Sequence, residues 1–428
     1  MQLHAVPSTD QEIYKVCTGT CPLFLHGHTH LFHDNIDAPY ADLPQITFVF
    51  VSTTSAQGNI MSKNPLCVMV GPAPEAQGGM ASVIQVYAES GLFSNGQVRL
   101  LPSFSDGSKL HKLITATKAL CSYASLLIRG KGEVLHVHVA SDASFWRKAM
   151  FIWLAVLWRR KIIFHLHSGG FIRFIEALPA WKRCCALATI RHSDQLLCLS
   201  TPAATWLRQI APLVPLRFWP NPIPAYLFES TNTETQAAQR APLLLYLGAL
   251  LPAKGVAELL QAFSTLFAKN PDARLIMAGN GPALAQLQAQ AVTLGVSEQV
   301  SFPGWIGPDE KNAWLRSARV LALASHTEAQ PMVLLEAMAC GAAVVSTSVG
   351  GIPDLIKHEV HGLLAPAHDA AAFATQLLRA WEDAALHQRL VQAARTHVAE
   401  NHHALQVRNA LLNLYMTLAD GQPGNMRR

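Results

Sequence analysis

Short apolar runs recur along most of this chain, each followed by a glycine-bearing loop and then by a segment with helical spacing of its apolar residues. The runs lie at 66–71, 134–140, 161–167 and 195–200, and again at 243–248, 274–279, 299–303, 320–325 and 342–347. Apolar runs of this length that alternate with helical segments are typical of βαβ units, in which helices cover a parallel sheet. The sequence therefore predicts an α/β fold.

A proline-rich break divides these runs into two series. Residues 219–224 read Trp-Pro-Asn-Pro-Ile-Pro, and a polar stretch extends from there to Arg240. Such composition is typical of linkers, and 428 residues exceed what one hydrophobic core usually organises. We therefore expect two domains. Their predicted bounds are 61–228 for the first domain, 229–241 for the hinge, 242–395 for the second domain and 396–428 for a final helix and tail.

Residues 1–60 differ from the rest, because they show no sustained helical or strand period apart from the run 46–51. They hold five histidines and two cysteines, which could indicate a metal site. No pair of these residues has zinc-finger spacing, so a poorly ordered leader is the favoured interpretation. Met61 begins a segment with the form of a domain start, so 1–60 could also lie outside the native chain.

Composition narrows the class of protein and its compartment. Half of the residues are hydrophobic and 14% are charged, which excludes a disordered or fibrous chain. The longest apolar stretch, 149–158, is about half of what spans a bilayer, so a transmembrane protein is not expected. Eight scattered cysteines without a preceding secretory signal indicate reduced thiols in the cytoplasm.

Positive charge is concentrated in the middle of the chain. The net charge is +5, but residues 61–240 hold 19 Lys and Arg against 9 Asp and Glu. Basic residues flank a leucine-bearing helical pattern in 109–131, and others bracket the apolar segment 149–158. Tryptophans 146, 153 and 158 resemble an interfacial belt, although a buried helix fits that segment equally well. We expect peripheral binding to an anionic membrane. Nucleic acid is disfavoured as the partner of this basic region, because the sequence contains no recognisable nucleic-acid-binding motif.

Loops after the predicted strands of the second domain carry unusual residues, and ligands of parallel sheets bind at such loops. In 248–255, GALLPAKG, Gly248 permits close backbone approach. Lys254 precedes a helix whose free amides could share a phosphate with it. The glycine turns 279–282 and 350–354 follow two further strands. Taken alone, each of these loops is more often an ordinary turn.

Two glutamates stand out in the loop and helix after 320–325. Glu328 lies in the loop, and Glu336 lies further along the helix that Pro331 can begin. Helix N-termini favour anions, so the pair could serve a ligand whose pyrophosphate binds there. The alternative is a capping Glu328 and a solvated Glu336. An unpaired charge inside the apolar run around Glu336 would be costly, which argues for a function.

These motifs, in their order over residues 61–418, resemble those of glycosyltransferase family four, which has the GT-B fold. The run 328–341, EAQPMVLLEAMACG, resembles the family signature, and GALLPAKG, AGNGP and VGGIPD stand at the family's positions. In the first domain, 78–80, 136–148 and 165–171 are similar to bacterial exopolysaccharide, capsule and lipopolysaccharide transferases. The resemblance implies two Rossmann-like α/β/α domains facing each other across a cleft, with the final helix crossing back to the first.

The resemblance also implies a role for each matching residue. Glu328 would hold hydroxyls of the donor sugar, Glu336 the ribose of the nucleotide, and Lys254 the diphosphate leaving group. His167 matches the family's histidine beside the reacting sugar. The further donor-binding positions implied are Gly248, Gly279, Gly281, Ala329, Gln330, Gly350 and Gly351. The positions implied for the acceptor and phosphate loop are Gly78, Gly79, Met80, Arg147 and Lys148.

Two positions depart from the family pattern. Ala249 stands where the family often has arginine, so one phosphate cation is missing, and Arg147 or Lys148 could supply it. Ala329-Gln330 replaces the usual Gly-Phe after the first glutamate.

The expected activity is a retaining transfer of a sugar from a UDP- or GDP-sugar to a saccharide or polyprenyl-diphosphate-linked acceptor in polysaccharide or glycolipid synthesis. The nucleotide-sugar is a co-substrate; no cofactor and no metal are expected, and the sequence contains no Asp-x-Asp. No residue stands out as a covalent nucleophile, which favours front-face displacement. A sugar-nucleotide epimerase of related fold is one alternative. A non-catalytic sugar-nucleotide-binding protein is the other, and Ala249 favours it slightly.

Overall fold

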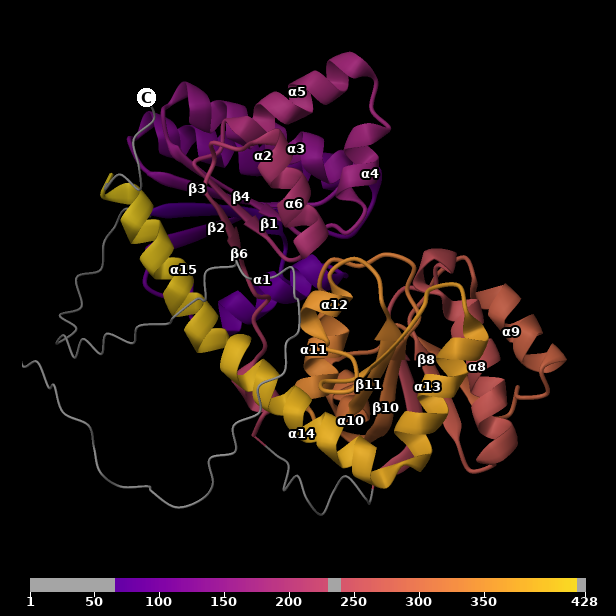
Figure 1. Ribbon diagram of the computed structural model, residues 1–428. Helices are drawn as coiled ribbons and strands as arrows, with labels where there is room; N and C mark the ends of the chain where they lie inside the picture. The colour runs from indigo at the N-terminus through magenta and orange to yellow at the C-terminus, as the bar shows by residue number, and fades with distance from the viewer. Residues whose placement is uncertain (1–65, 230–239, 422–428) are drawn as a thin grey trace, which may run out of the picture. The chain divides into compact units, whose positions relative to one another are not determined.

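The computed structural model describes residues 66–229 and 240–421, which form two parallel α/β units (Figure 1). Residues 1–60, with their histidines and cysteines, and most of the predicted hinge lie outside the described residues. We name the two units the N-terminal lobe and the C-terminal lobe.

The N-terminal lobe contains a six-stranded sheet in the order β2-β1-β3-β4-β5-β6, and every neighbouring pair is parallel. Its strands are β1 Cys67–Pro72, β2 Val98–Phe104, β3 Val134–Val139, β4 Lys161–Leu166, β5 Gln195–Cys198 and β6 Leu216–Phe218. Its helices are α1 Gly79–Glu89, α2 Lys109–Ile128, α3 Ala143–Leu157, α4 Phe171–Glu176, α5 Ala180–Arg191 and α6 Thr201–Ile210. The central strands are fully buried, as expected of a parallel sheet covered on both faces.

The C-terminal lobe repeats this plan with the strand order β12-β11-β10-β7-β8-β9, again all parallel. Its strands are β7 Ala241–Leu247, β8 Arg274–Ala278, β9 Val300–Gly304, β10 Ala318–Leu323, β11 Ala343–Thr347 and β12 Leu363–Ala365. Its helices are α8 Val256–Lys269, α9 Leu284–Thr293, α10 Pro308–Ser317, α11 Met332–Ala339, α12 Ile352–Leu355, α13 Ala370–Glu382 and α14 Ala384–Asn401, with a short 3₁₀ turn at Pro252–Lys254.

The predicted α/β fold is confirmed, and all nine apolar runs form strands. Three strands were not predicted, namely β2, β6 and β12. Each lies at the edge of its sheet. Edge strands are less covered than central ones, so β2 mixes buried residues with half-buried ones and an exposed Arg99, whereas β6 and β12 are three residues long. An arginine interrupts β2 and β6, and β12 (Leu-Leu-Ala) is apolar but too short to stand out, which is why the pattern missed them.

Helix α3 contains most of the apolar segment 149–158. Phe151, Ile152 and Ala155 are buried, and the helix packs on the sheet of the N-terminal lobe, as the buried-helix interpretation expects. Trp146 and Trp158 are partly buried against the same core, whereas Trp153 is 43% exposed, so the interfacial-belt interpretation stays a prediction. Among the described residues, no helix combines the length and the hydrophobicity that crossing a bilayer would require.

The chain passes from the C-terminal lobe back to the N-terminal lobe through helix α15, Ala404–Ala419. Helix α14 packs against α11 and ends next to His402, whose carbonyl accepts a hydrogen bond from the Ile223 amide at 2.7 Å. Tyr415 of α15 then reaches the core of the N-terminal lobe, where its hydroxyl lies 2.6 Å from Nδ1 of His136. The segment that leaves the N-terminal lobe and the segment that returns to it therefore lie side by side at Ile223.

Candidate functional site

A cavity of about 560 Å³ lies among the loops that follow the carboxyl ends of both sheets. Its N-terminal-lobe lining comes from the segments after β1, β3, β4, β5 and β6. Its C-terminal-lobe lining comes mostly from those after β7, β9 and β10. The predicted site residues that line it are Gly78, Gly79, Met80, His167, Gly248, Lys254, Glu328, Ala329, Gln330 and Glu336. Residues predicted from distant parts of the sequence thus meet around one space.

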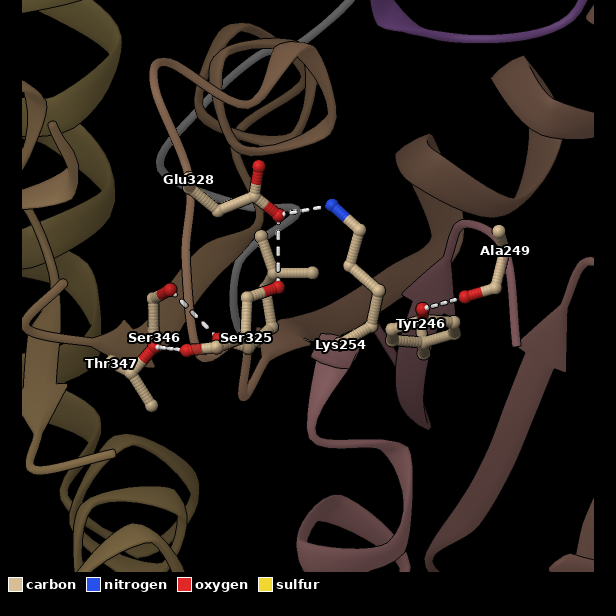
Figure 2. A network of polar contacts seen from close by, with 8 residues as sticks. Tyr246, Ala249, Lys254, Ser325, Glu328, Ser346 and Thr347 are labelled. Carbon is tan, nitrogen blue, oxygen red and sulfur yellow. Dashed lines mark hydrogen bonds and ion pairs between the residues drawn. The ribbon is translucent and has the colours of Figure 1, made fainter. Parts of the chain in front are cut away.

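Lys254 and Glu328 form an ion pair in this cavity, with Nζ 2.6 Å from Oε1 (Figure 2). The two residues follow β7 and β10, which are neighbours in the sheet, so the topology brings their loops together. Ser325 also donates a hydrogen bond to Oε1 of Glu328 at 2.9 Å. Figure 2 shows the other carboxylate oxygen pointing away from Lys254. The pair therefore presents a cation and a free carboxylate oxygen on the wall of the cavity.

Glu336 forms a second ion pair in the cavity, with its Oε1 2.7 Å from Nζ of Lys311 in α10. Glu336 is only 5% exposed, and its Oε2 has no hydrogen-bond partner within the described ranges. A buried carboxylate oxygen without a donor is costly, so this atom is ready to accept a hydrogen bond from a hydroxyl group of a ligand. The sequence analysis missed Lys311, because a single lysine in a polar helix carries no signal.

The glycines at 279, 281, 350 and 351 do not line the cavity but support the loops that do. An added Cβ on Gly279 would lie 1.8 Å from the carbonyl oxygen of Gly248, and one on Gly351 would lie 1.9 Å from that of Ala329. Gly281 packs in the same way against the Leu250 carbonyl. These positions require glycine because the backbones of two adjacent loops touch there.

His167 lies on the cavity wall and belongs to a cluster of four histidines on β3 and at the end of β4. Its Nε2 lies 2.8 Å from Nδ1 of His138. Deeper in the lobe, Nε2 of His136 lies 3.2 Å from Nδ1 of His165. Burial lowers the pKa of His136 and of His167 to about 3. Electrostatic repulsion adds to this lowering of the pKa, between His136 and His167 when both are protonated, and between His167 and Lys148. The imidazole beside the cavity is therefore neutral at physiological pH.

This cluster makes folding stability depend on pH. Below the ordinary histidine pKa of about 6.5, the unfolded chain binds protons that the buried His136 and His167 do not, so the stability falls as pH drops toward 3. Two such groups lower the free energy of unfolding by roughly 4 kcal/mol between pH 7.5 and 5.0. Urea unfolding at pH 7.5 and pH 5.0 measures this. The difference in the free energy of unfolding between the two pH values should be smaller in His136→Gln than in the wild type. The control His111→Ala, at an exposed histidine, should not change that difference. The same difference in His136→Gln and the wild type would contradict the role given to His136.

Arg147 and Lys148 lie in α3, outside the cavity lining. The guanidinium of Arg147 stands 5.3 Å from the ring centroid of Phe104, and Nζ of Lys148 donates to the Ser144 hydroxyl at 3.1 Å. Burial, together with the charge of Arg147, lowers the pKa of Lys148 to about 7. The phosphate role predicted for these two residues stays a prediction.

Hydrogen bonds also cross from one lobe to the other at the rim of the cavity. The carboxylate of Asp354 accepts from both the amide and the hydroxyl of Thr201, each at 2.6 Å. Thr201 is the first residue of α6, and Ser200 is the N-cap of that helix. The Gln330 side chain, predicted to bind the donor, accepts from the Asn221 amide at 2.8 Å. Both contacts hold the lobes together.

Removing the Asp354 contact is expected to favour separation of the lobes. Asp354→Ala eliminates an acceptor at a helix N-terminus, worth about 1 kcal/mol, which shifts an open–closed equilibrium about fivefold. Small-angle scattering should then give a larger radius of gyration for the variant. Asp369→Ala is the matched control, since Asp369 caps α13 within its own lobe and should leave the radius unchanged. The same radius for Asp354→Ala and the wild type would rule out this latch.

Comparison with known proteins gives a family match for the C-terminal-lobe part of this site. Residues 229–397, about two fifths of the chain, match the family model described as Glycosyl transferases group 1. A D-inositol 3-phosphate glycosyltransferase of Saccharomonospora viridis is 33% identical over 239 residues, which is 52% of this chain and 53% of that protein. An N-acetyl-alpha-D-glucosaminyl L-malate synthase of Bacillus anthracis is 29% identical over 185 residues, covering 43% and 48%. The chain spans about half the length of these curated relatives.

Solved structures extend the likeness to both lobes. A sucrose-phosphate synthase from Thermosynechococcus elongatus superposes with a TM-score of 0.68 at 18% identity, over 83% of this chain and 99% of that one. Anabaena HepE in complex with UDP-glucose gives a TM-score of 0.63 at 16% identity, over 82% and 99%. The predicted GT-B fold is confirmed, and the C-terminal lobe of this chain is similar to the glycosyl transferases group 1 domain.

Proposed function

We propose that this protein is a retaining glycosyltransferase of family four that transfers a sugar from a UDP- or GDP-sugar to a saccharide or lipid-linked saccharide. The observation that carries the proposal is the Lys254–Glu328 pair beside the half-paired Glu336, all on one cavity wall. A cation, a sugar-binding carboxylate and a ribose-binding carboxylate are what a nucleotide-sugar requires. The solved structure of HepE with UDP-glucose supports a donor of this class.

In the proposed reaction, Lys254 and the amides at the start of α11 stabilise the diphosphate as it departs. Such preorganised electrostatic contacts usually supply the largest part of an enzyme's rate enhancement. Glu328 exchanges its bond with Lys254 for hydroxyls of the donor sugar, and Oε2 of Glu336 accepts from the ribose. The acceptor oxygen bonds to the anomeric carbon on the face that the diphosphate leaves, and its proton passes to a leaving phosphate oxygen. No metal takes part in the chemical steps of this scheme, so transfer should not require added Mg²⁺ or Mn²⁺.

His167 stands on the opposite wall of the cavity, contributed by the N-terminal lobe. Since its imidazole is neutral, one ring nitrogen carries no proton and can accept a hydrogen bond from a sugar hydroxyl. Nε2 of His167 is hydrogen-bonded to His138, so Nδ1 of His167 is left for the ligand. The N-terminal lobe thus completes a site whose charged groups come from the C-terminal lobe.

The test is a screen of UDP-, GDP- and ADP-sugars with and without a polyprenyl-diphosphate saccharide acceptor. Transfer that needs both substrates, with the anomeric configuration retained, supports the proposal. Donor conversion without an acceptor would instead favour an epimerase of related fold. Binding of a nucleotide-sugar without turnover would favour a non-catalytic binding protein. A glycosyl adduct trapped on a carboxylate would refute front-face displacement.

We further propose that the N-terminal lobe lies on the cytoplasmic face of an anionic membrane, where it meets an acceptor for polysaccharide or glycolipid synthesis. Leu110 and Leu113 of α2 are 65% and 63% exposed, and Lys109 and Lys112 stand beside them. Exposed leucines next to lysines are typical of interfacial helices. Leu110→Ser with Leu113→Ser should weaken binding to vesicles that contain phosphatidylglycerol. Leu213→Ser, at a 93% exposed leucine elsewhere in the lobe, should not. Binding indifferent to anionic lipid and to salt would refute this part.

A further inference from the structure

A second group of ligating side chains lies outside the cavity and has no part in the proposed reaction. Glu258 belongs to the first turn of α8, His326 to the loop after β10, and His368 to the loop after β12. One ligand atom from each lies within 4.8 Å of the other two. Nε2 of His326 is 2.9 Å from Oε1 of Glu258, and Nδ1 of His368 is 3.8 Å from the same oxygen. Three segments far apart in sequence thus converge on one point.

The separations of these atoms suit a metal ion. Bonds of 2.0–2.2 Å from zinc to nitrogen and oxygen place tetrahedral ligand atoms about 3.3 Å apart. The two separations from Oε1 of Glu258, 2.9 and 3.8 Å, lie on either side of that value. Small shifts that move His326 away from Glu258 and the exposed His368 side chain toward it would bring both to it. The side chains of Glu258 and His326 are 26% and 21% exposed, and that of His368 is 67% exposed. Water can therefore reach the ion and complete its coordination.

The chemistry of the three ligands selects the class of ion. Two imidazoles and one carboxylate favour zinc and its neighbours such as cobalt and nickel, whereas magnesium and calcium prefer oxygen ligands alone. The negative carboxylate of Glu258 would also partly neutralise the positive charge of the ion. The other convergent group in the described chain, His136, His138 and His165, contains no carboxylate and is fully buried. An ion there would have no balancing charge in a dry core, which is costly.

The position of the group connects it to the loops of the proposed donor site. His326 lies two residues before Glu328, and its amide donates to the carbonyl of Ala253 at 2.9 Å. Ala253 in turn precedes Lys254, and Glu258 follows one turn later in the same segment. We propose that Glu258, His326 and His368 bind a divalent transition-metal ion that fastens the loop of Glu328 to the segment of Lys254. The ion would be structural, away from the reacting atoms.

Zinc binding by the untagged full chain tests this proposal. Protein stripped with EDTA and then dialysed is titrated with Zn²⁺ in competition with a chromogenic chelator. The wild type should bind one more equivalent than His368→Ala, or bind it at least about tenfold more tightly, because losing a ligand is no milder than losing a second-shell partner. Histidines and cysteines in 1–60 add the same background to every variant, so the difference between variants reports this site alone.

Matched variants keep the result interpretable. His358→Ala removes another exposed histidine beside a glutamate, Glu359 at 3.9 Å, but one outside any three-ligand group found among the described residues, so its zinc binding should equal the wild type. Glu258→Gln should lose zinc as His368→Ala does, and only the variants that keep the site should gain thermal stability when Zn²⁺ is added. Equal stoichiometry and affinity in His368→Ala and the wild type would overturn the proposal, whatever the outcome of the donor screen.

Discussion

Replacing Glu328 by glutamine is expected to lower kcat for sugar transfer about 10²–10³-fold, the loss typical of one preorganised electrostatic contact. Glutamine keeps the size of the side chain and can still accept from Ser325, but it loses the charge that pairs with Lys254 at 2.6 Å. The sugar hydroxyls would then meet a weaker acceptor, and Lys254 would lose its partner. Steady-state kinetics with the donor found in the screen measure the effect.

The fold of the Glu328→Gln variant should be little changed. The ion pair lies at the edge of the cavity, where Lys254 is 30% exposed, and pairs of this kind contribute at most about 1 kcal/mol. Glu359→Gln is the matched control, since Glu359 pairs with Arg379 on the surface of the same lobe. That control should leave kcat within a factor of about two. Full activity in Glu328→Gln would remove this residue from the mechanism.

Replacing Gly350 by alanine is expected to reduce both the stability and kcat/KM severely. Gly350 has φ +56°, and a Cβ there would lie 1.9 Å from the carbonyl oxygen of Glu328 and 3.3 Å from its nitrogen. The loop of Glu328 would have to move by more than an ångström, since a real contact of this kind needs over 3 Å. A misplacement of about 1 Å can lower a rate about 10²-fold. We therefore expect a loss of that order in kcat/KM, together with a clear fall in Tm.

Gly295→Ala separates the steric effect from the backbone effect. Gly295 lies in the same lobe with φ +69°, so alanine there meets a similar left-handed strain of about 1–2 kcal/mol. An added Cβ at Gly295 would have no neighbour within 4 Å. Calorimetry and kinetics on both variants should therefore show a modest fall in Tm for Gly295→Ala without loss of activity. Equal losses in the two variants would mean that contact with the Glu328 loop is unimportant.

Much of the donor side of the site could be predicted because it depends on sheet topology. Lys254 and Glu328 are 74 residues apart, yet both follow strands, and the carboxyl ends of parallel strands share one edge. A motif placed after a strand therefore already locates its side chain at that edge. Glu336 was identified by a second pattern, because it is a charged residue within an otherwise apolar helix. These inferences needed only the strand pattern and the residue types.

The contacts between elements could not be predicted in this way. Lys311 reaches Glu336 from a helix whose sequence is merely polar, and Gln330 turned out to bond Asn221 of the other lobe. Both contacts depend on how the helices and the lobes pack, which strand periodicity does not encode. Arg147 and Lys148 show the converse, because a basic pair beside a motif says nothing about which face of α3 it occupies. Sequence patterns located the loops, and packing determined the partners.

The return of helix α15 to the N-terminal lobe has a consequence for synthesis on the ribosome. The last strand of that lobe ends at Phe218, but α15 begins at Ala404, so the helix follows roughly 180 residues later. At roughly 5–20 residues per second, on the order of ten to forty seconds separate the two. Throughout that interval the nascent lobe lacks Leu411, Leu414 and Tyr415, which are buried in the finished fold. The growing chain therefore exposes an apolar surface while its second half is translated, and chaperones that bind such surfaces should associate with it at that stage.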